Sequence, residues 1–460
     1  MSENKNILSY EKKTVFEKAG KDVVDAAYEY AKGYVAYLDA SKTEREATTE
    51  SIRIAEAAGY RPYTFGMPMK AGDKLYFNNR GKNVFLFKLG TEPINNGIRI
   101  TGAHIDSPRL DLKQVPLFEE ADMCYLKTHY YGGIRKYQWL AMPLALHGVV
   151  VKQDGEIVNI TIGENDDDPV MYITDLLPHL AAGEVSKTVS QAFQGEKLNL
   201  LVGSRPYDGE EKEAVKMGVL HYLYENYGII EEDLQSAELS VVPAGRARDV
   251  GFDRSLICGY GHDDRVCAYP SLTAMIDADE SLHTTMCILV DKEETGSDGV
   301  TGMQSYLIMD LIAEIAKAMG GNEAAVRANS KCLSSDVAAI FDPAFAEVYE
   351  KRNSALINCG VAMCKYTGAR GKGGTSDASA ELVAWVRRVL NEAGVVWQSC
   401  ELGKIDVGGG GTIAYICALY GMEVIDSGVP VLNMHAPWEV ISKADLFEAF
   451  KGYKAFVLNA

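Results

Sequence analysis

A continuous apolar run at residues 284–290, followed at once by acidic residues, constrains this chain more than any other feature of its sequence. The run reads Thr-Thr-Met-Cys-Ile-Leu-Val, without the polar alternation of a strand that faces water on one side. Such a run is typical of a strand buried on both faces of an α/β sheet. Glu293 and Glu294 then stand where the strand leaves the core, at the carboxyl edge where open α/β sheets bind ligands.

The two neighbouring glutamates indicate a metal ion. Adjacent carboxylates repel each other and do not both ionise comfortably without a strong positive charge beside them. A metal ion supplies that charge, so that one glutamate can ligate the ion while the other takes a proton from bound water. A solvated acidic turn is the alternative, and it is the simpler interpretation for an isolated Glu-Glu pair. The rest of the chain has to decide between the two.

The composition is that of an ordinary globular protein of more than one domain. With 460 residues the chain exceeds a single ordinary core, so two domains are expected. A net charge of −18 argues against nucleic acid as a partner, because its phosphates would be repelled. Nine cysteines without any C-x-x-C pair, together with a polar start to the chain and no membrane-length apolar run, predict a cytoplasmic protein that does not bind membranes.

Helices and strands alternate along most of the chain. Residues 14–60 are predicted to be helical, with a capping box at 41–44 in which Ser41 and Glu44 bind free N–H groups. A hairpin is predicted from strands at 74–77 and 84–87, and another strand is expected at 98–101. This alternation predicts an α/β fold whose central, mostly parallel sheet is flanked by helices.

The sequence pattern changes between residues 107 and 246, which predicts an inserted domain. Residues 146–162 read as a strand, an Asp-Gly turn and an alternating strand. We therefore expect a β-rich insertion at 107–246 within a discontinuous domain formed by residues 1–106 and 247–460.

Five residues of types that ligate metals each stand just beyond a predicted strand. They are His104, Asp263, Glu294, Asp336 and His435. Two imidazoles and three carboxylates suit zinc, cobalt or manganese better than magnesium or calcium. If one carboxylate is shared, each of two ions has three protein ligands, which predicts a two-metal hydrolytic site. Asp106 can share the site of His104, because residues two apart in a strand point to the same side.

Taken together, these motifs resemble those of a known family. They lie at residues 102–108 (Gly-Ala-His-Ile-Asp-Ser-Pro), 131–133 (Tyr-Gly-Gly), 262–265 (His-Asp-Asp-Arg), 291–297 (Asp-Lys-Glu-Glu-Thr-Gly-Ser), 335–336 (Ser-Asp) and 434–436 (Met-His-Ala). The chain is similar over essentially its whole length to the aspartyl aminopeptidases and their bacterial relatives, the eighteenth family of metallopeptidases. The resemblance implies a zinc aminopeptidase that removes single residues from peptide N-termini. The discontinuous domain would be catalytic, and the insertion would serve dimerisation.

The resemblance also implies a role for each candidate residue. His104 and Asp336 would hold one ion, Glu294 and His435 the other, and Asp263 would bridge both. Asp106 would orient His104, and Glu293 would be the general base. In similar enzymes a cis peptide follows the bridging aspartate, so the Asp263–Asp264 bond is expected to be cis.

The resemblance alone implies roles for two further residues. Lys365 would lie beside the substrate. Similar proteins form dimers through the inserted domain, and six dimers build a closed homododecamer in which His179 would reach the neighbouring subunit's site and stabilise its oxyanion. The alternative for His179 is a hydrogen bond inside its own domain.

Substrate choice stays open at this point. Residues 137–139 and the Gly/Lys-rich segment at 365–374 differ from the best-known members, so acidic (Asp or Glu) and neutral N-terminal residues are both retained. A dipeptidase or deacylase with a neutral preference on the same binuclear site is a second hypothesis, since fold and metals do not determine the substrate. A catalytically dead assembly protein is a third, and the intact ligand set with Glu293 argues against it.

Overall fold

The computed structural model describes residues 8–459, and the chain divides into two compact units. Unit 1 contains the described residues up to Asp106, then 247–434, and then those from Glu439 onward. Unit 2 contains residues 107–246, the range expected of the insertion, and also residues 435–438, which the sequence had placed in the first domain. The addition has a local cause, because His435 Nδ1 lies 2.9 Å from the carbonyl oxygen of Gly133 within unit 2.

Unit 1 is built on a nine-stranded sheet with a parallel centre. In spatial order its strands are β1 (Arg61–Pro62), β2 (Lys74–Asn79), β3 (Asn83–Lys88), β14 (Thr285–Val290), β4 (Arg99–His104), β15 (Lys331–Ser334), β19 (Glu423–Gly428), β17 (Val361–Cys364) and β18 (Trp397–Ser399). Strands β14, β4, β15 and β19 run parallel, whereas β3 and β17 join them antiparallel. The predicted buried strand and the predicted hairpin are confirmed as β14 and as β2 with β3.

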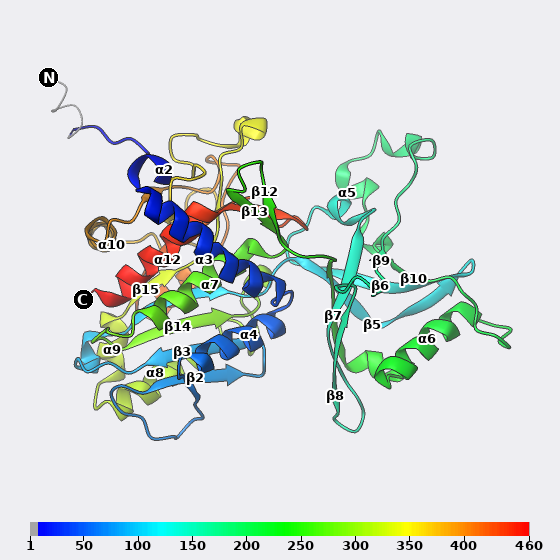
Figure 1. The fold of residues 1–460 in the computed structure, drawn as a ribbon, viewed down its shortest axis with the longest axis horizontal. Helices are drawn as coiled ribbons and strands as arrows, with labels where there is room; N and C mark the ends of the chain where they lie inside the picture. The colour runs from blue at the N-terminus through cyan, green and yellow to red at the C-terminus, as the bar shows by residue number, and fades with distance from the viewer. Residues whose placement is uncertain (1–7, 460) are drawn as a thin grey trace. The chain divides into compact units, whose positions relative to one another are not determined.

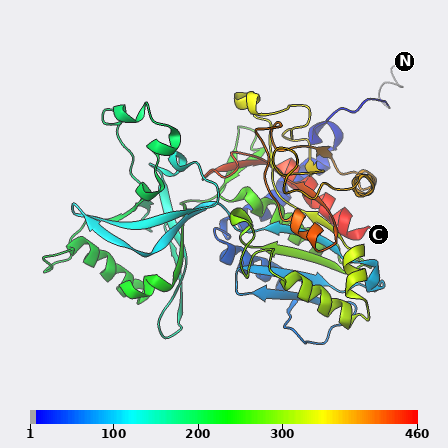
Figure 2. The same ribbon diagram turned by 180° about the vertical axis from the view of Figure 1, so that it is seen from behind.

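Helices cover both faces of this sheet. On one face lie α3 (Lys21–Asp39), α4 (Glu44–Ala57), α7 (His262–Asp277), α10 (Ala380–Glu392) and α12 (Lys443–Leu458), of which α3, α7 and α12 are seen in Figure 1. On the other lie α8 (Leu307–Ala318), α9 (Glu323–Asn329) and α11 (Ala414–Leu419), and Figure 2 shows α8 and α11 from that side. Along β14, Cys287 and Leu289 enter the first core and Met286, Ile288 and Val290 enter the second, so both faces are buried as predicted.

A smaller sheet completes unit 1. Its five strands are, in order, β12 (Arg248–Val250), β13 (Leu256–Gly259), β21 (Glu439–Ser442), β20 (Pro430–Leu432) and β16 (Ala338–Ala339). Strand β13 pairs antiparallel with β21, so that Gly259 lies opposite Glu439. This pairing places the start of β21 next to the turn that leads into α7.

The N-terminal helices correct one prediction. The helical stretch consists of α2 (Val15–Lys18), α3 and α4, with breaks at Gly20 and before Thr43. The capping box of α4 is formed by Thr43 and Glu46, not by Ser41 and Glu44. The N-cap must be the residue whose backbone is still extended, and Thr43 has φ −128° and ψ 163°.

Unit 2 is an antiparallel β structure with one long helix. Its sheet order is β11 (Ala237–Pro243), β5 (Arg109–Glu120), β6 (Met123–Tyr131), β10 (Leu200–Gly203), β9 (Met171–Tyr172), β7 (Pro143–Val151) and β8 (Ile157–Ile162). Because β11 also pairs with β7, six of these strands close into a ring. Helix α6 (Ala214–Tyr227) and the short α5 (Val189–Ala192) accompany the strands.

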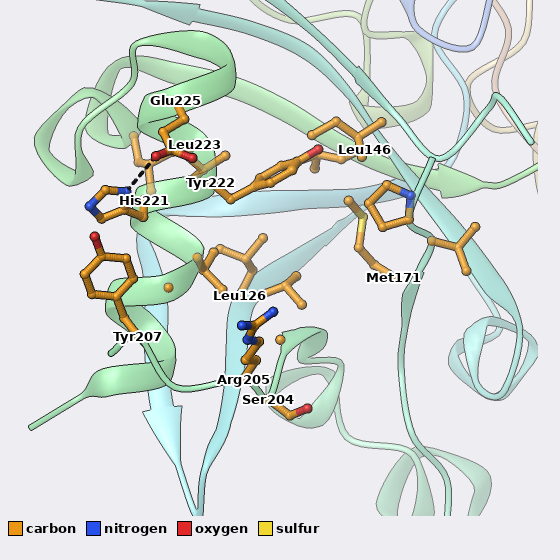
Figure 3. A pocket seen from close by; sticks show the side chains of 18 of the residues that line it. Leu126, Leu146, Met171, Ser204, Arg205, Tyr207, His221, Tyr222, Leu223 and Glu225 are labelled. Carbon is orange, nitrogen blue, oxygen red and sulfur yellow. Dashed lines mark ion pairs between the residues drawn. The ribbon is translucent and has the colours of Figure 1, made fainter. Parts of the chain in front are cut away.

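An apolar cavity of about 780 Å³ lies within unit 2, between α6 and the strands (Figure 3). Aliphatic side chains such as Leu126, Leu146 and Met171 line it, and Arg205 lies among them. At the helix His221 pairs with Glu225 at 3.3 Å. None of the five predicted metal ligands is among the described residues that line this cavity.

Among residues 8–459, no helix is both long enough and apolar enough to cross a membrane.

Candidate metal centre

Adjacent strand ends of unit 1 carry the predicted site residues. Strand β4 lies between β14 and β15, and His104 at its end is in register with Val290 of β14. Glu293 and Glu294 follow β14 in a short 3₁₀ turn, and Asp336 follows β15 by two residues. Since parallel strands end at a common edge, these side chains meet although they are far apart in sequence.

The carboxylate of Asp106 connects two of these strand ends. Its Oδ1 accepts a hydrogen bond from the main-chain N–H of Glu293, and its Oδ2 accepts one from Glu294, each at 3.2 Å. His104 Nδ1 lies 3.0 Å from the carbonyl oxygen of Asp106 and 3.3 Å from its carboxylate. Because a carbonyl can only accept, Nδ1 carries a hydrogen, and Nε2 points to the other side of the ring, where it lies 3.1 Å from Asp263 Oδ1.

Three overlapping groups of side chains could each hold a cation. Within each group the candidate ligand atoms lie within 4.8 Å of one another. The groups are His104 with Glu293 and Asp336, His104 with Asp263 and Glu294, and Asp263 with Asp264 and Asp336. Four of the five predicted ligands are therefore brought together within unit 1.

The electrostatics of the cluster favour a cation. Burial raises the pKa of Asp336 well above its usual value, and the carboxylates of Asp264 and Glu293 raise it further. Burial lowers the pKa of His104, but its hydrogen bonds with Asp106 and Asp263 and the nearby charges of Glu293 and Asp264 together outweigh burial, so that its pKa also lies well above the ordinary value. A divalent cation would remove this repulsion, and imidazole nitrogen with carboxylate oxygens is a donor set that zinc accepts. The residues therefore fit the ion that the sequence predicts.

Buried hydrogen bonds hold the turn that carries the glutamate pair. Thr301 Oγ1 donates to Asp291 Oδ2 at 2.6 Å, which closes the loop from 291 to 301 on itself. Asn79 and Asn83, both buried in the β2–β3 hairpin, donate side-chain hydrogen bonds to the carbonyl oxygens of Val300 and Thr301 at 2.9 and 2.7 Å. The hairpin thus supports the turn, a contribution that the sequence did not indicate.

Asp264 is a member of the cluster that sequence reasoning missed. The Asp263–Asp264 peptide bond is cis, as expected from the resemblance. Asp264 is fully buried, and burial raises the pKa of its carboxyl group well above the usual value. Its place in the His-Asp-Asp-Arg motif was the available signal, but adjacency alone does not say which aspartate faces the site.

Besides Asp106, which contacts His104 without belonging to a group, three predicted residues lie outside these groups. His435 belongs to unit 2, where its Nδ1 lies close to the Gly133 carbonyl oxygen, so its Nδ1 also carries the hydrogen. His179 is exposed in a turn of unit 2, and its side chain makes no hydrogen bond to the rest of residues 8–459. Lys365, on the surface of unit 1, forms an ion pair with Asp377 at 2.5 Å.

Comparisons with known proteins agree with one another. The profile of the family described as Aminopeptidase I zinc metalloprotease (M18) matches residues 37–457. A probable M18 family aminopeptidase 1 from Clostridium acetobutylicum is 52% identical over 99% of this chain and 100% of its own length. The crystal structure of an M18 family aminopeptidase from Thermotoga maritima is 44% identical, with a TM-score of 0.94 over 98% of this chain and 100% of that chain. The structure of the S. cerevesiae mApe1 dodecamer shares the fold at 21% identity, with a TM-score of 0.76 over 93% of this chain and 96% of that chain.

Gly428 provides a test of the cluster, because the main chain of Asp336 leaves no room for a side chain there. A Cβ at Gly428 would lie 1.7 Å from the Asp336 carbonyl oxygen and 2.5 Å from its carbonyl carbon. We expect Gly428→Ala to displace Asp336 and to lower zinc affinity about tenfold or more. Zinc per chain and zinc affinity measure this. Gly411→Ala is the control, since a Cβ there meets nothing within 4 Å and its backbone is outside the left-handed region, and equal zinc binding in both variants would contradict the prediction.

Proposed function

This chain belongs to the M18 family of zinc metalloproteases and is an aminopeptidase, and on that premise we propose that each subunit binds two divalent cations at the cluster around His104. Zinc is the first choice, and cobalt and manganese suit the same donors. The observation that carries the proposal is the turn after β14, where Asp106 holds the main chain of two neighbouring glutamates beside an imidazole. Such a turn can present one glutamate to an ion and leave its neighbour for proton transfer.

We assign the ligands in two sets that share Asp263. His104 and Asp336 hold one ion, Glu294 and His435 hold the other, and Asp263 serves both. The two histidines have a common feature that supports this assignment. In each, Nδ1 donates to a main-chain carbonyl oxygen, of Asp106 for His104 and of Gly133 for His435, which leaves Nε2 for the ion.

The remaining residues of the centre transfer the proton and hold the reacting groups in position. The cations, when bound, polarise the scissile carbonyl and make the attacking water more acidic. Glu293 takes the proton from that water and delivers it to the leaving amine, so it acts as general base and then as general acid. Asp106 keeps Glu293 in place through its main-chain N–H and orients the ring of His104.

Substitution of Glu293 separates proton transfer from ion binding. Glu293→Gln should keep the metal content of the wild type, because Glu293 is not assigned as a ligand. Its kcat should fall by about 10²- to 10⁴-fold, since no base remains at that position. Elemental analysis and steady-state kinetics on a peptide substrate measure both quantities. A variant that remains active, or that is isolated without metal, would show that the roles of Glu293 and Glu294 are assigned wrongly.

We further propose that Lys365 favours substrates with an acidic N-terminal residue. Lys365 and Lys372 both pair with Asp377, at 2.5 and 3.1 Å, and Arg370 lies in the same segment. One carboxylate does not neutralise three cations, so the segment keeps a positive charge that an aspartate or glutamate side chain can approach.

Lys365→Ala tests this preference. The variant should lose about tenfold in kcat/KM on Asp- and Glu-peptides and little on Leu- or Ala-peptides, because only the acidic side chains lose a charge partner. Glu381→Ala, a charge change outside this segment, is the control. Equal losses on all substrates, or a wild-type enzyme that prefers neutral residues, would reject the role of Lys365. A peptide-mixture digest read by mass spectrometry also distinguishes the aminopeptidase from a dipeptidase or deacylase.

We propose that unit 2 mediates assembly into a homodimer and, from six dimers, a homododecamer. Five apolar side chains around His179 are exposed, and this grouping is typical of a protein interface. They are Leu176, Leu177, Leu180, Val185 and Val189. The mApe1 dodecamer with the same fold supports the larger assembly. In this arrangement His179 serves the neighbouring subunit's reaction by donating a hydrogen bond to its oxyanion.

Mixing two inactive variants tests the action of His179 across subunits. His179→Ala should lose about 10²- to 10³-fold in kcat, the effect of one missing oxyanion donor. Mixed with Glu293→Gln subunits and reassembled, it should regain part of the activity, because some sites combine an intact Glu293 with a neighbour's His179. Native mass spectrometry establishes that mixed particles form. If they form and stay inactive, His179 does not act on the neighbouring site.

We also place the protein in the cytoplasm. All nine cysteines are free thiols, and thiols persist in a reducing compartment. Cell fractionation with an antibody against the chain measures the location directly.

A further inference from the structure

Glu439 is a buried carboxylate that contacts the candidate centre from outside the predicted site residues. It is the first residue of β21, it is 1% exposed, and its Oε2 accepts a hydrogen bond from the main-chain N–H of Asp263 at 3.0 Å. The two residues are 176 positions apart in the sequence. The pairing of β13 with β21 brings them together, because it places Glu439 opposite Gly259 at the entry to α7.

A buried carboxylate at this position brings a negative charge as well as a hydrogen-bond acceptor. Removing a charge from water is unfavourable, and a neutral amide oxygen could accept the same N–H. Glu439 moreover places a further acidic group beside a cluster that already has an excess of them. The additional carboxylate makes physical sense where a cation is to be bound, since it strengthens the negative field at that place.

The residue preceding Asp263 is also held by specific hydrogen bonds. His262 is fully buried, its Nε2 lies 3.2 Å from the carbonyl oxygen of Ile257, and its Nδ1 lies 2.6 Å from the Tyr34 hydroxyl. Because the carbonyl can only accept, Nε2 donates and Nδ1 accepts from Tyr34. The side chain of His262 and the N–H of Asp263 therefore fix two consecutive residues, and the orientation of the Asp263 carboxylate follows from this main chain.

We propose that Glu439 is a positioning residue for metal binding, which holds the main chain of Asp263 so that the Asp263 carboxylate faces the ions. The inference rests on the proposed function of Asp263 as a ligand. It adds an element from β21, immediately after the segment that carries His435, to a centre otherwise built at the ends of β4, β14 and β15. A purely structural role would predict a loss of stability without any change in ion affinity.

Three substitutions at Glu439 test this inference. Glu439→Met removes the acceptor at similar side-chain length, Glu439→Asp keeps the charge but withdraws it from the N–H, and Glu439→Gln keeps an acceptor oxygen without the charge. Zinc affinity is measured on the full chain by competition with a chelator, and zinc per chain by elemental analysis. We expect affinity for at least one ion to fall about 10- to 100-fold in the Met and Asp variants, and less in the Gln variant.

Glu448 is a matched control. It is a fully buried glutamate of the same unit whose Oε2 accepts the main-chain N–H of Val396 at 2.7 Å and which also pairs with Lys451 at 3.0 Å, and neither Val396 nor Lys451 is a candidate ligand. Glu448→Gln and Glu448→Met should lower the unfolding temperature in excess chelator while leaving zinc affinity unchanged. If the Glu448 variants lose zinc as the Glu439 variants do, the effect at Glu439 is general destabilisation and the inference is rejected.

The outcomes separate this inference from the ligand assignment itself. Asp263→Ala is measured in parallel, and a variant that keeps both ions at wild-type affinity would refute Asp263 as a ligand. If Asp263→Ala loses zinc but the folded Glu439→Met chain binds both ions as tightly as the wild type, Glu439 does not position the centre. Should Glu439→Met fail to fold, Glu439→Asp decides the question by the same criterion.

Discussion

The hydrogen bonds received by the buried carboxylate of Asp106 are the interaction on which the centre depends most. Two main-chain N–H groups, of Glu293 and Glu294, donate to it at 3.2 Å. His104 Nδ1 lies 3.0 Å from the main-chain carbonyl oxygen of the same residue. An ionised carboxylate is suited to this position because both of its oxygens only accept. The NH2 group of a side-chain amide would instead face one of the two main-chain N–H groups, and both are donors. The ends of β4 and β14 are thereby held together, and the positions of the imidazole and the two glutamates depend on each other.

The cluster gathers acidic groups in a buried place, where water does not screen the repulsion between them. Asp263 and Asp264 are buried; Asp336 shares a candidate group with both of them, Glu294 shares one with Asp263, and Glu293 shares one with Asp336. Such burial and crowding destabilise a protein without a counter-charge: burial first, and then the carboxylates of Asp264 and Glu293, raise the pKa of Asp336. The same crowding provides the free energy for binding divalent cations, so folding, proton release and ion binding are linked at this centre.

The path of the chain between its two units also bears on the centre. The chain leaves unit 1 after Asp106, and it leaves again after Met434 and returns at Glu439. Three of the residues at these crossing points have a part in the centre: Asp106 in the observed geometry, and His435 and Glu439 in the proposals above.

The sequence by itself determined the parallel α/β core and four of the clustered candidate ligands. A run buried on both faces and acidic or imidazole residues after strand ends are local patterns, and the alignment of parallel strands at one edge turns them into a common site. The positions of Asp264 and Glu439 were decided only by the tertiary structure, since neither adjacency nor composition says which buried carboxylate faces which group. The same holds for the cap of α4, where Thr43 replaced Ser41, because a cap depends on the residue at which the backbone leaves the helix. Contacts such as that of Glu439 with Asp263 join residues 176 positions apart, and only strand pairing can bring them within hydrogen-bond distance.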